Sequence, residues 1–220
     1  MQPSVENLCS LLVTSRLYPP EKVVAIRQGW QVEAKDSASV GQFLRWLVAN
    51  QYVTAYQANQ LSNGHVETLI LGPYKLLERL GQGRMAGVFK AVHSSTGQVV
   101  AIKVLPLARA QDKHVLSRFQ REARLAMQLH HPSVVRTFHV GESAGRHFLV
   151  MEYLEGDTLE ALLKQRDFLP VPEAVRIAFL SCLGLQHIHE KGMVHRDLKP
   201  ANMMLCPSPA AQEDTLKCMI

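Results

Sequence analysis

The spacing of the apolar residues changes at Gly72-Pro73, and this change constrains the fold more than any other feature of the sequence. Upstream of this pair, apolar residues such as Val23, Ile26 and Trp30 recur at helical spacing. Downstream, short strand-like runs are separated by turn-forming residues. Because a Gly-Pro pair breaks regular structure, the sequence predicts a helical module with its linker over residues 1–72 and an α+β domain over residues 73–220.

The helical module is predicted to contain two to four helices. Pro19-Pro20-Glu21 marks the start of one helix, because proline is tolerated in the first turn and an acidic residue is favourable at the positive end of the helix dipole. Ser39 precedes a second apolar-periodic stretch, and Thr54 caps a third that ends at Asn63-Gly64. We interpret the aromatic residues of the module as core residues, and the module as a regulatory or partner-binding element.

The α+β domain begins with the pattern of an antiparallel sheet interrupted by one helix. Ser94-Ser95-Thr96-Gly97 predicts the turn between two of its strands. Two helices follow, and then a short strand pair joined by a polar insertion that is longer than a tight hairpin needs. The predicted strands are 74–80, 87–93, 99–105, 134–140, 147–153, 202–205 and 215–220, the predicted helices are 115–129, 158–164 and 172–191, and the insertion is 206–214.

Composition argues against several classes of protein. No apolar run approaches the ~18 residues that span a bilayer, and the first ten residues lack the basic start of a secretory signal. The four cysteines are widely spaced without a C-x-x-C pair, so they predict reduced thiols in the cytoplasm rather than a zinc site or disulfides. Nothing in the sequence resembles a nucleic-acid-binding module.

The net charge of +5 belongs to the second part of the chain. Residues 1–72 hold five basic and five acidic side chains, which leaves 19 basic and 14 acidic side chains in residues 73–220. This excess has two interpretations, which the sequence leaves open: an ordinary solvated surface, or positive charge that faces phosphates around a nucleotide site.

The most informative motif is the stretch from His195 to Asn202, which reads H-R-D-L-K-P-A-N. The stretch resembles the catalytic loop of protein kinases, and Lys199-Pro200 within it is the pattern of the serine/threonine branch. Phosphoryl transfer needs an acceptor for a hydroxyl proton and an oxygen ligand for Mg²⁺ on one loop, and the resemblance implies that Asp197 and Asn202 supply these groups. The resemblance implies that Lys199 neutralises charge on the transferred phosphoryl group.

Residues 80–88 resemble the glycine-rich loop that covers the ATP phosphates in this family. Glycines let the backbone approach the phosphates without a Cβ in the way. The sequence departs from the family's pattern at one position, because the third glycine falls at Ala86 and Gly87 follows it. The resemblance assigns ATP binding to Leu80, Gly81, Gln82, Gly83, Arg84, Met85, Ala86, Gly87 and Val88.

Val100-Ala101-Ile102-Lys103 resembles the third-strand motif whose lysine contacts the α- and β-phosphates. A flexible ammonium needs a carboxylate to hold it in place. Glu122 stands on the next predicted helix at the spacing that the family uses. The resemblance therefore implies that Lys103 and Glu122 form an ion pair at the nucleotide.

Residues 148–156 resemble the strand and hinge that join the two lobes of a kinase. The resemblance implies that Met151 lies at the back of the adenine pocket and that Glu152 and Leu154 offer backbone groups to the adenine edge. It also implies that Val88 and Ala101 line the roof of this pocket.

Residues 74–220 as a whole resemble bacterial serine/threonine protein kinases of the eukaryotic-like (Hanks) type. The family's fold implies a five-stranded antiparallel N-lobe sheet with helix C over about 74–153, and an incomplete helical C-lobe over about 154–220. Its activity implies transfer of the γ-phosphate of ATP to serine or threonine hydroxyls of proteins in signal transduction. Mg²⁺ is the metal expected, with Asn202 as one ligand.

The sequence reaches Ile220 before any Asp-Phe-Gly triplet, whose aspartate is a main Mg²⁺ ligand of the family. Two hypotheses follow: the chain is the N-terminal part of an active kinase, or it is a catalytically inactive, kinase-derived scaffold or interaction protein. The presence of Lys103, Glu122, Asp197 and Asn202 together favours the first. We expect a cytoplasmic location, and whether a membrane anchor follows residue 220 stays open.

Overall fold

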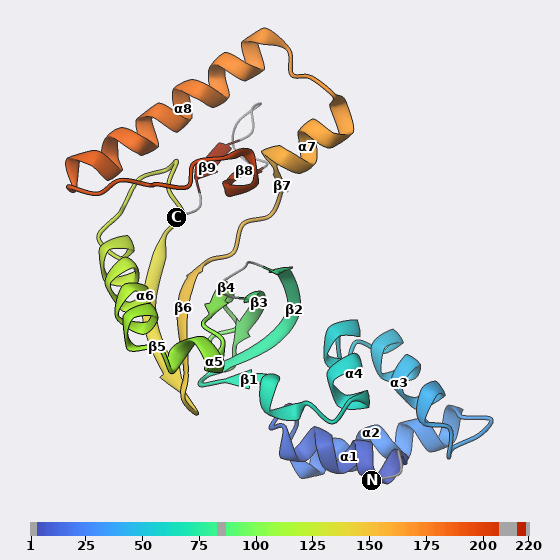
Figure 1. Ribbon diagram of the computed structural model, residues 1–220. Helices are drawn as coiled ribbons and strands as arrows, with labels where there is room; N and C mark the ends of the chain where they lie inside the picture. Colours follow the sequence, from blue (N-terminus) through green and yellow to red (C-terminus); the bar gives the residue numbers. More distant parts are fainter. Residues whose placement is uncertain (1–3, 83–86, 207–214, 219–220) are drawn as a thin grey trace. The chain divides into compact units, whose positions relative to one another are not determined.

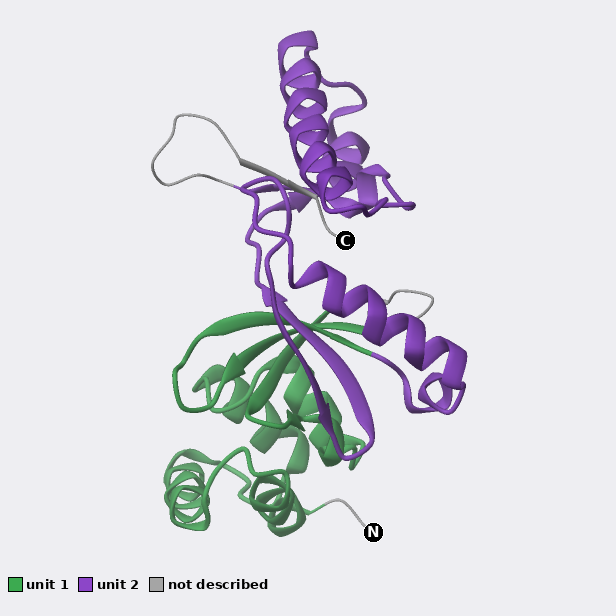
Figure 2. Cartoon of the chain, turned by 90° about the vertical axis from the view of Figure 1, so that its left-hand side faces the viewer, with its two compact units in different colours: residues 1–104 green, residues 105–220 purple. Residues whose placement is uncertain are grey.

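A computed structural model of the chain describes residues 4–82, 87–206 and 215–218 (Figure 1). It divides into two compact units, residues 1–104 and residues 105–220, which Figure 2 shows in green and purple. Each unit has helices and antiparallel strands of its own. None of the described helices is both long and apolar enough to cross a membrane.

The first unit begins with the helices of the module. The predicted helices are confirmed as α2, α3 and α4, and α2 has proline in its first turn as expected. The sequence analysis does not predict α1, which Ser4 caps by accepting a hydrogen bond from the backbone N–H of Asn7 at 3.1 Å. The helices are α1 (Val5–Thr14), α2 (Pro20–Glu33), α3 (Val40–Ala49) and α4 (Ala55–Ser62).

These helices enclose an apolar core. Leu12, Phe43 and Leu47 have no exposed surface, and the ring of Trp30 lies 5.6 Å from the ring of Phe43. Trp30 and Phe43 are therefore packing residues, as predicted. The same core includes Leu69, which precedes the first strand, so the packing of the module continues into the start of the sheet.

A short 3₁₀ helix, η1 (Val66–Thr68), leads from the module into the strands of the first unit. Each of these strands is antiparallel to the next. The predictions for β2, β3 and β4 are confirmed within two residues at each end, whereas β1 is not predicted. The strands are β1 (Ile70–Leu71), β2 (Tyr74–Gln82), β3 (Gly87–His93) and β4 (Val99–Val104).

Gly72-Pro73 forms the turn of a hairpin, since Leu71 pairs with Tyr74 across it. Gly72 has a φ of +58°, and the proline ring holds φ of the next residue negative. This combination suits a two-residue turn of type II′. The pair thus joins two strands of one sheet, although the sequence analysis interprets it as a break in regular structure.

The second unit begins with the short helix α5 (Leu107–Ala110), which is not predicted, and the predicted helix α6 (Lys113–Ala126). Asp112 caps the start of α6, and its Oδ1 accepts hydrogen bonds from the backbone N–H groups of His114 and Val115 at 2.8 and 3.3 Å. These bonds lower the pKa of Asp112, because they favour its ionised form. The helix is followed by the antiparallel hairpin of β5 (Thr137–Ser143) and β6 (Arg146–Glu152).

Strand β5 begins at Thr137 rather than at Val134, where the sequence analysis places it. Val134 and Val135 are buried, at 2% and 4% exposure, in a segment that precedes the strand. Val134 packs with Leu129 and Ile188 in a small apolar cluster. The apolar run that suggests a strand therefore reflects burial of the segment before β5, where Val134 packs against helix α8 (Val171–Glu190).

The remainder of the second unit combines two helices with a small sheet in which β7, β8 and β9 are antiparallel in that order. The predicted helices are confirmed as α7 and α8, and the predicted strand pair as β8 and β9. Residues 207–214 of the predicted insertion and residues 219–220 of the predicted last strand lie outside the described residues. The elements are β7 (Asp157–Thr158), α7 (Leu159–Arg166), α8 (Val171–Glu190), η2 (Pro200–Asn202), β8 (Met203–Cys206) and β9 (Thr215–Cys218).

Gly156 lies where the chain enters β7 and passes against β8. A Cβ at this position would lie 2.0 Å from the carbonyl oxygen of Leu205, and φ of Gly156 is +142°. A side chain would meet backbone, which cannot rotate away as a flexible side chain can. The pairing of β7 with β8 therefore requires glycine here.

We expect Gly156→Ala to lower the free energy of unfolding by about 3 kcal/mol, because it forces β7 away from β8. Chemical denaturation followed by circular dichroism measures the change. Gly192→Ala is the matched control, since Gly192 also has a positive φ, +71°, but no atom lies within 4 Å of its Cβ position. Its expected loss is about 1 kcal/mol, and equal losses for the two variants would contradict a role for the contact with Leu205.

Candidate functional site

The predicted site residues are divided between the two units. The strands of the glycine-rich loop, Ala101 and Lys103 belong to the first unit. Glu122, an exposed residue of α6, belongs to the second unit together with the hinge and the catalytic loop. The ion pair of Lys103 with Glu122 stays a prediction, because its members belong to different units.

Strands β2 and β3 flank the glycine-rich loop. Gly81 pairs with Val88 and Gln82 with Gly87, so the ladder continues to the edge of the described residues. Leu80, in β2, is exposed to solvent. The predicted phosphate contacts of the central loop residues stay predictions, because these residues lie outside the described part of the chain: Gly83, Arg84, Met85 and Ala86.

Gly87 lies close to the ring of Phe89. A Cβ there would lie 2.9 Å from Cε2 of Phe89. The ring of Phe89 therefore lies against the backbone at the start of β3, and a larger residue would displace it. Glycine at position 87 therefore leaves room for the Phe89 ring beside the backbone.

The register of β3 and β4 places predicted nucleotide-binding residues on one face of the sheet. Val88 is directly opposite Lys103, and Ala101 precedes Lys103 by two positions. Directly opposite residues share a face, and so do residues two apart on one strand. Val88, Ala101 and Lys103 therefore lie on the same face, whereas Ile102, which has no exposed surface, lies on the other.

The end of β6 carries the predicted hinge residues. Met151 pairs with Thr137 and is half-buried, as is Leu154 beyond the strand. The backbone N–H of Glu152 donates to the carbonyl of Arg136 at 2.9 Å, and the backbone N–H of Arg136 donates to Oε1 of Glu152 at 2.7 Å. Because the N–H of Glu152 is used in this way, the carbonyl is the backbone group through which Glu152 would meet an adenine.

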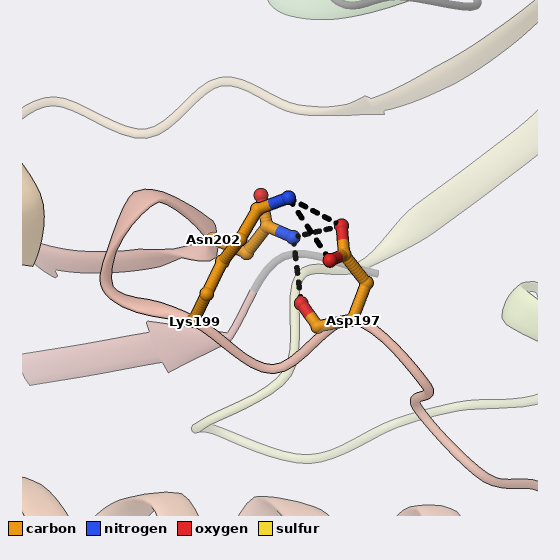
Figure 3. A network of polar contacts seen from close by, with 3 residues as sticks. All are labelled: Asp197, Lys199 and Asn202. Atoms are coloured by element: carbon orange, nitrogen blue, oxygen red, sulfur yellow. Dashed lines mark hydrogen bonds and ion pairs between the residues drawn. The ribbon is translucent and has the colours of Figure 1, made fainter.

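Asp197, Lys199 and Asn202 form one polar network (Figure 3). The Lys199 ammonium donates to both carboxylate oxygens of Asp197, at 2.9 Å to Oδ1 and 2.8 Å to Oδ2. The Asn202 side-chain amide donates to Oδ2 of Asp197 at 2.9 Å and to its backbone carbonyl at 2.8 Å. The structure thus brings the predicted catalytic residues together on one short loop.

These hydrogen bonds lower the pKa of Asp197. Lys199 has the larger effect and Asn202 the next, because both donate to the ionised carboxylate. The Asp197 side chain is 64% exposed, so a protein hydroxyl can reach it from solvent. At neutral pH the group is a carboxylate that can accept a hydrogen bond or a proton.

The backbone before Asp197 has an uncommon conformation. Arg196 has a φ of +63°, and the N–H of Asp197 donates to the carbonyl of His195 at 2.8 Å. A hydrogen bond between residues two apart, around a residue with positive φ, is the rare and strained form of γ-turn. This conformation of Arg196 is not predicted from the sequence, and no local signal indicates it, because arginine has no preference for positive φ.

The side-chain oxygen of Asn202 is directed away from the Asp197 carboxylate. Since Nδ2 of Asn202 is directed at Asp197, Oδ1 points away from the carboxylate, as Figure 3 shows. Oxygen atoms are the ligands that Mg²⁺ prefers, and nucleotide phosphates and water usually complete its coordination. Asn202 therefore fits the predicted ligand. Within the described residues, no cluster of three histidine, cysteine or acidic side chains could hold a metal by itself.

Comparison with known proteins agrees with this geometry. The family model of the protein kinase domain matches residues 74–217. Because this match covers more than half of the 220 residues, the chain belongs to the protein kinase family. Its similarity to these proteins identifies residues 74–217 as a bacterial serine/threonine kinase domain of the Hanks type. In this chain the helical module precedes that domain.

Two curated relatives and one solved structure illustrate the similarity. Serine/threonine-protein kinase PrkC of Bacillus subtilis is 37% identical over 136 residues, which are 62% of this chain and 21% of that protein. Serine/threonine-protein kinase pkn2 of Myxococcus xanthus is 39% identical over 153 residues, 68% of this chain and 18% of that protein. The crystal structure of the Mycobacterium tuberculosis PknI kinase domain matches with a TM-score of 0.59 at 29% identity, over 68% of this chain and 60% of that one. The chain thus spans about a fifth of the length of these curated relatives.

We expect the Asp197 carboxyl to titrate below the usual range of aspartate, and Lys199→Met to raise its pKa by removing the larger of the two stabilising effects. NMR of the side-chain carboxyl carbon against pH measures both values. Because the folded-state pKa is lowered, the contribution of Asp197 to stability is present above the pKa of the unfolded chain and is lost as pH falls through the folded-state value.

Lys164→Met is the control for this titration. It removes an exposed lysine that pairs with Glu160 on α7 at 3.2 Å, so it should leave the titration of Asp197 unchanged. A pKa of Asp197 that is the same in Lys199→Met and in the unsubstituted protein would show that Lys199 does not hold the carboxylate.

Proposed function

We propose that the protein is a serine/threonine protein kinase that transfers the γ-phosphate of ATP to serine and threonine hydroxyls of other proteins in signal transduction. The observation that carries this proposal is the network of Asp197, Lys199 and Asn202. One loop holds a carboxylate that can accept a proton, an ammonium within 3 Å of it, and an amide oxygen suited to Mg²⁺.

Asp197 is the proposed base. Its lowered pKa keeps the carboxylate ionised, so it can accept the hydrogen bond of the substrate hydroxyl and direct the oxygen towards the γ-phosphorus. The proton passes to Asp197 as the oxygen–phosphorus bond forms and ADP leaves. Lys199, beside the carboxylate, neutralises negative charge on the transferred group.

We assign nucleotide binding to residues from both parts of the kinase domain. Lys103 contacts the α- and β-phosphates and Glu122 holds it, while the residues of the glycine-rich loop, 80–88, cover the phosphates. Met151, Glu152 and Leu154 meet the adenine. The shared face of Val88, Ala101 and Lys103 supports this assignment, because a nucleotide needs its apolar and its phosphate contacts on the same side of the sheet.

Asn202 holds Mg²⁺ through Oδ1 in this proposal. When bound, Mg²⁺ neutralises charge on the β- and γ-phosphates. The Asp-Phe-Gly aspartate that the family also uses does not occur in the 220 residues, so Asn202 is the metal ligand that we assign from this chain.

The proposed partners are ATP and protein substrates, and the proposed location is the cytoplasm, where ATP is available. Cys9, Cys182 and Cys206 are free thiols, which suits a reducing compartment. We propose a regulatory role for the helical module.

We expect Mg-ATP to raise the thermal unfolding midpoint of the protein in a saturable, Mg²⁺-dependent way, because ligand binding stabilises the folded state. Lys103→Ala should abolish this shift by removing the phosphate contact, and a thermal-shift titration measures it. Lys191→Ala, an exposed lysine after α8, should leave the shift unchanged. A folded sample without any shift would contradict the nucleotide site and favour a kinase-derived scaffold.

We expect Asp197→Ala to reduce phosphate transfer by about 10²- to 10⁴-fold, the usual contribution of a positioned base. Incorporation of labelled γ-phosphate into a generic protein substrate, followed by phosphoamino-acid analysis, measures the rate and the residue modified. The Mg-ATP thermal shift of the same variant should remain, since Asp197 is not a phosphate contact. Asp167→Ala, an exposed aspartate after α7, is the control, and transfer at an unchanged rate in Asp197→Ala would exclude the proposed base.

A further inference from the structure

Helix α4 of the module is hydrogen-bonded to strand β2, the strand that leads into the glycine-rich loop. The hydroxyl of Thr54 donates to the carbonyl of Leu77, and the side-chain amide of Gln57 donates to the carbonyl of Leu76 at 2.8 Å. Gln57 is 4% exposed, so its bond is shielded from water. The two elements are labelled α4 and β2 in Figure 1.

The same two side chains form the capping box of α4. The hydroxyl of Thr54 accepts from the backbone N–H of Gln57 at 3.1 Å, and Oε1 of Gln57 accepts from the backbone N–H of Thr54 at 3.0 Å. Each side chain therefore holds the start of the helix with one interaction and β2 with another. The side chains of Thr54 and Gln57 therefore connect the first turn of α4 to the backbone of β2.

The carbonyls that α4 binds lie at an irregularity of β2. Leu76 pairs with Ala91 and Glu78 with Lys90, so Leu77 is an extra residue in the ladder with β3, a β-bulge. The carbonyl of Leu77 accepts from Thr54 there. A bulge bends its strand and increases the local twist, so whatever holds the bulge also sets the direction in which β2 runs towards the glycine-rich loop.

Gln57 binds β2 opposite the residue that precedes β1. The backbone N–H of Leu76 donates to the carbonyl of Leu69 at 2.9 Å, on the side of β2 that faces β1. The N–H and carbonyl of one strand residue point to the same side, but the N–H of Leu69 donates to the carbonyl of Val66 at 3.1 Å and is not available to the carbonyl of Leu76. The amide of Gln57 supplies the donor instead.

A third contact from α4 reaches the strand on the other side of the loop. The ring of Tyr56 lies 5.9 Å from the ring of Phe89 in β3. The Phe89 ring in turn lies against Gly87, the first residue of β3. Helix α4 thus touches both strands that flank the glycine-rich loop.

We propose that Thr54, Tyr56 and Gln57 are positioning residues of the nucleotide site: by holding the bulge of β2 and the start of β3, they set the course of these two strands, which carry Gly81 and Val88 of the proposed site, and hence the affinity for Mg-ATP. This inference rests on the proposed function. In this proposal, α4 affects nucleotide binding by positioning β2 and β3, and it does not contact the nucleotide itself.

Thr54→Asp separates the two interactions of Thr54. Aspartate is a good helix cap, so it retains the acceptor for the backbone N–H of Gln57, but its carboxylate cannot donate to the carbonyl of Leu77. Thr54→Ser keeps both interactions and is the rescue variant. Ser4→Asp is the matched control, because Ser4 caps α1 of the same module through its hydroxyl. Tyr56→Leu tests the contact with Phe89 by removing the ring.

Each variant of the 220-residue chain is examined in two ways: its dissociation constant for ATP with Mg²⁺, by calorimetry, and amide hydrogen exchange of β2 and β3 without nucleotide. We expect Thr54→Asp to raise the dissociation constant about tenfold, the scale of one lost hydrogen bond to a shielded group, and to speed exchange in β2. Tyr56→Leu should weaken binding and speed exchange at the start of β3. Thr54→Ser and Ser4→Asp should match the unsubstituted protein in both measurements.

Faster exchange in β2 with unchanged affinity would overturn the proposal, because the contact would then be structural only. Unchanged exchange and unchanged affinity would overturn it as well. An unsubstituted protein that is folded but binds no Mg-ATP would contradict the proposed function itself, which distinguishes the two failures. Circular dichroism verifies folding, and if Thr54→Asp does not fold, Thr54→Val, which keeps the volume and loses the hydroxyl, replaces it.

Discussion

The first unit is arranged around the backbone of strand β2, whose polar groups need partners on both sides. Strand β3 pairs with one side, β1 with the start of the other, and the capping residues of α4 bind the carbonyls of Leu76 and Leu77. A buried backbone carbonyl without a partner costs about 1–3 kcal/mol. Helix α4 therefore packs beside the sheet and also supplies hydrogen-bond donors to its backbone. Leu69, which immediately precedes β1, belongs to the apolar core of the module.

The catalytic loop depends on a different kind of interaction, one that is local in sequence. Asp197, Lys199 and Asn202 are close in the chain, and their charges and hydrogen bonds need only a short loop of defined shape. The γ-turn at Arg196 and the 3₁₀ turn over Pro200–Asn202 give the loop that shape. Such a network can be recognised in a sequence, because the order of the residues nearly determines which of them can meet.

Secondary structure follows the sequence wherever side-chain periodicity and burial agree. The helices α2, α3, α4, α7 and α8 and the strands β2, β3 and β4 have the pattern of an amphipathic face or a buried strand, and their positions are predicted well. The pattern misleads at Val134 and Val135, which are buried in the segment before β5, where Val134 packs against Ile188 of α8. It is silent for β1 and α5, since two and four residues are too few to show a period.

The sequence by itself determined the family, and it predicted the longer elements in order and the loop of Asp197, Lys199 and Asn202, because motifs and periodicity involve residues that are near one another in the chain. The tertiary structure decided the rest. It turned Gly72-Pro73 into a hairpin turn, required glycine at Gly156 through the close approach of the Leu205 carbonyl, and joined the cap of α4 to the bulge of β2. These features depend on contacts between residues that are distant in sequence, or on close approaches of the backbone. Composition and the spacing of residues do not predict such contacts.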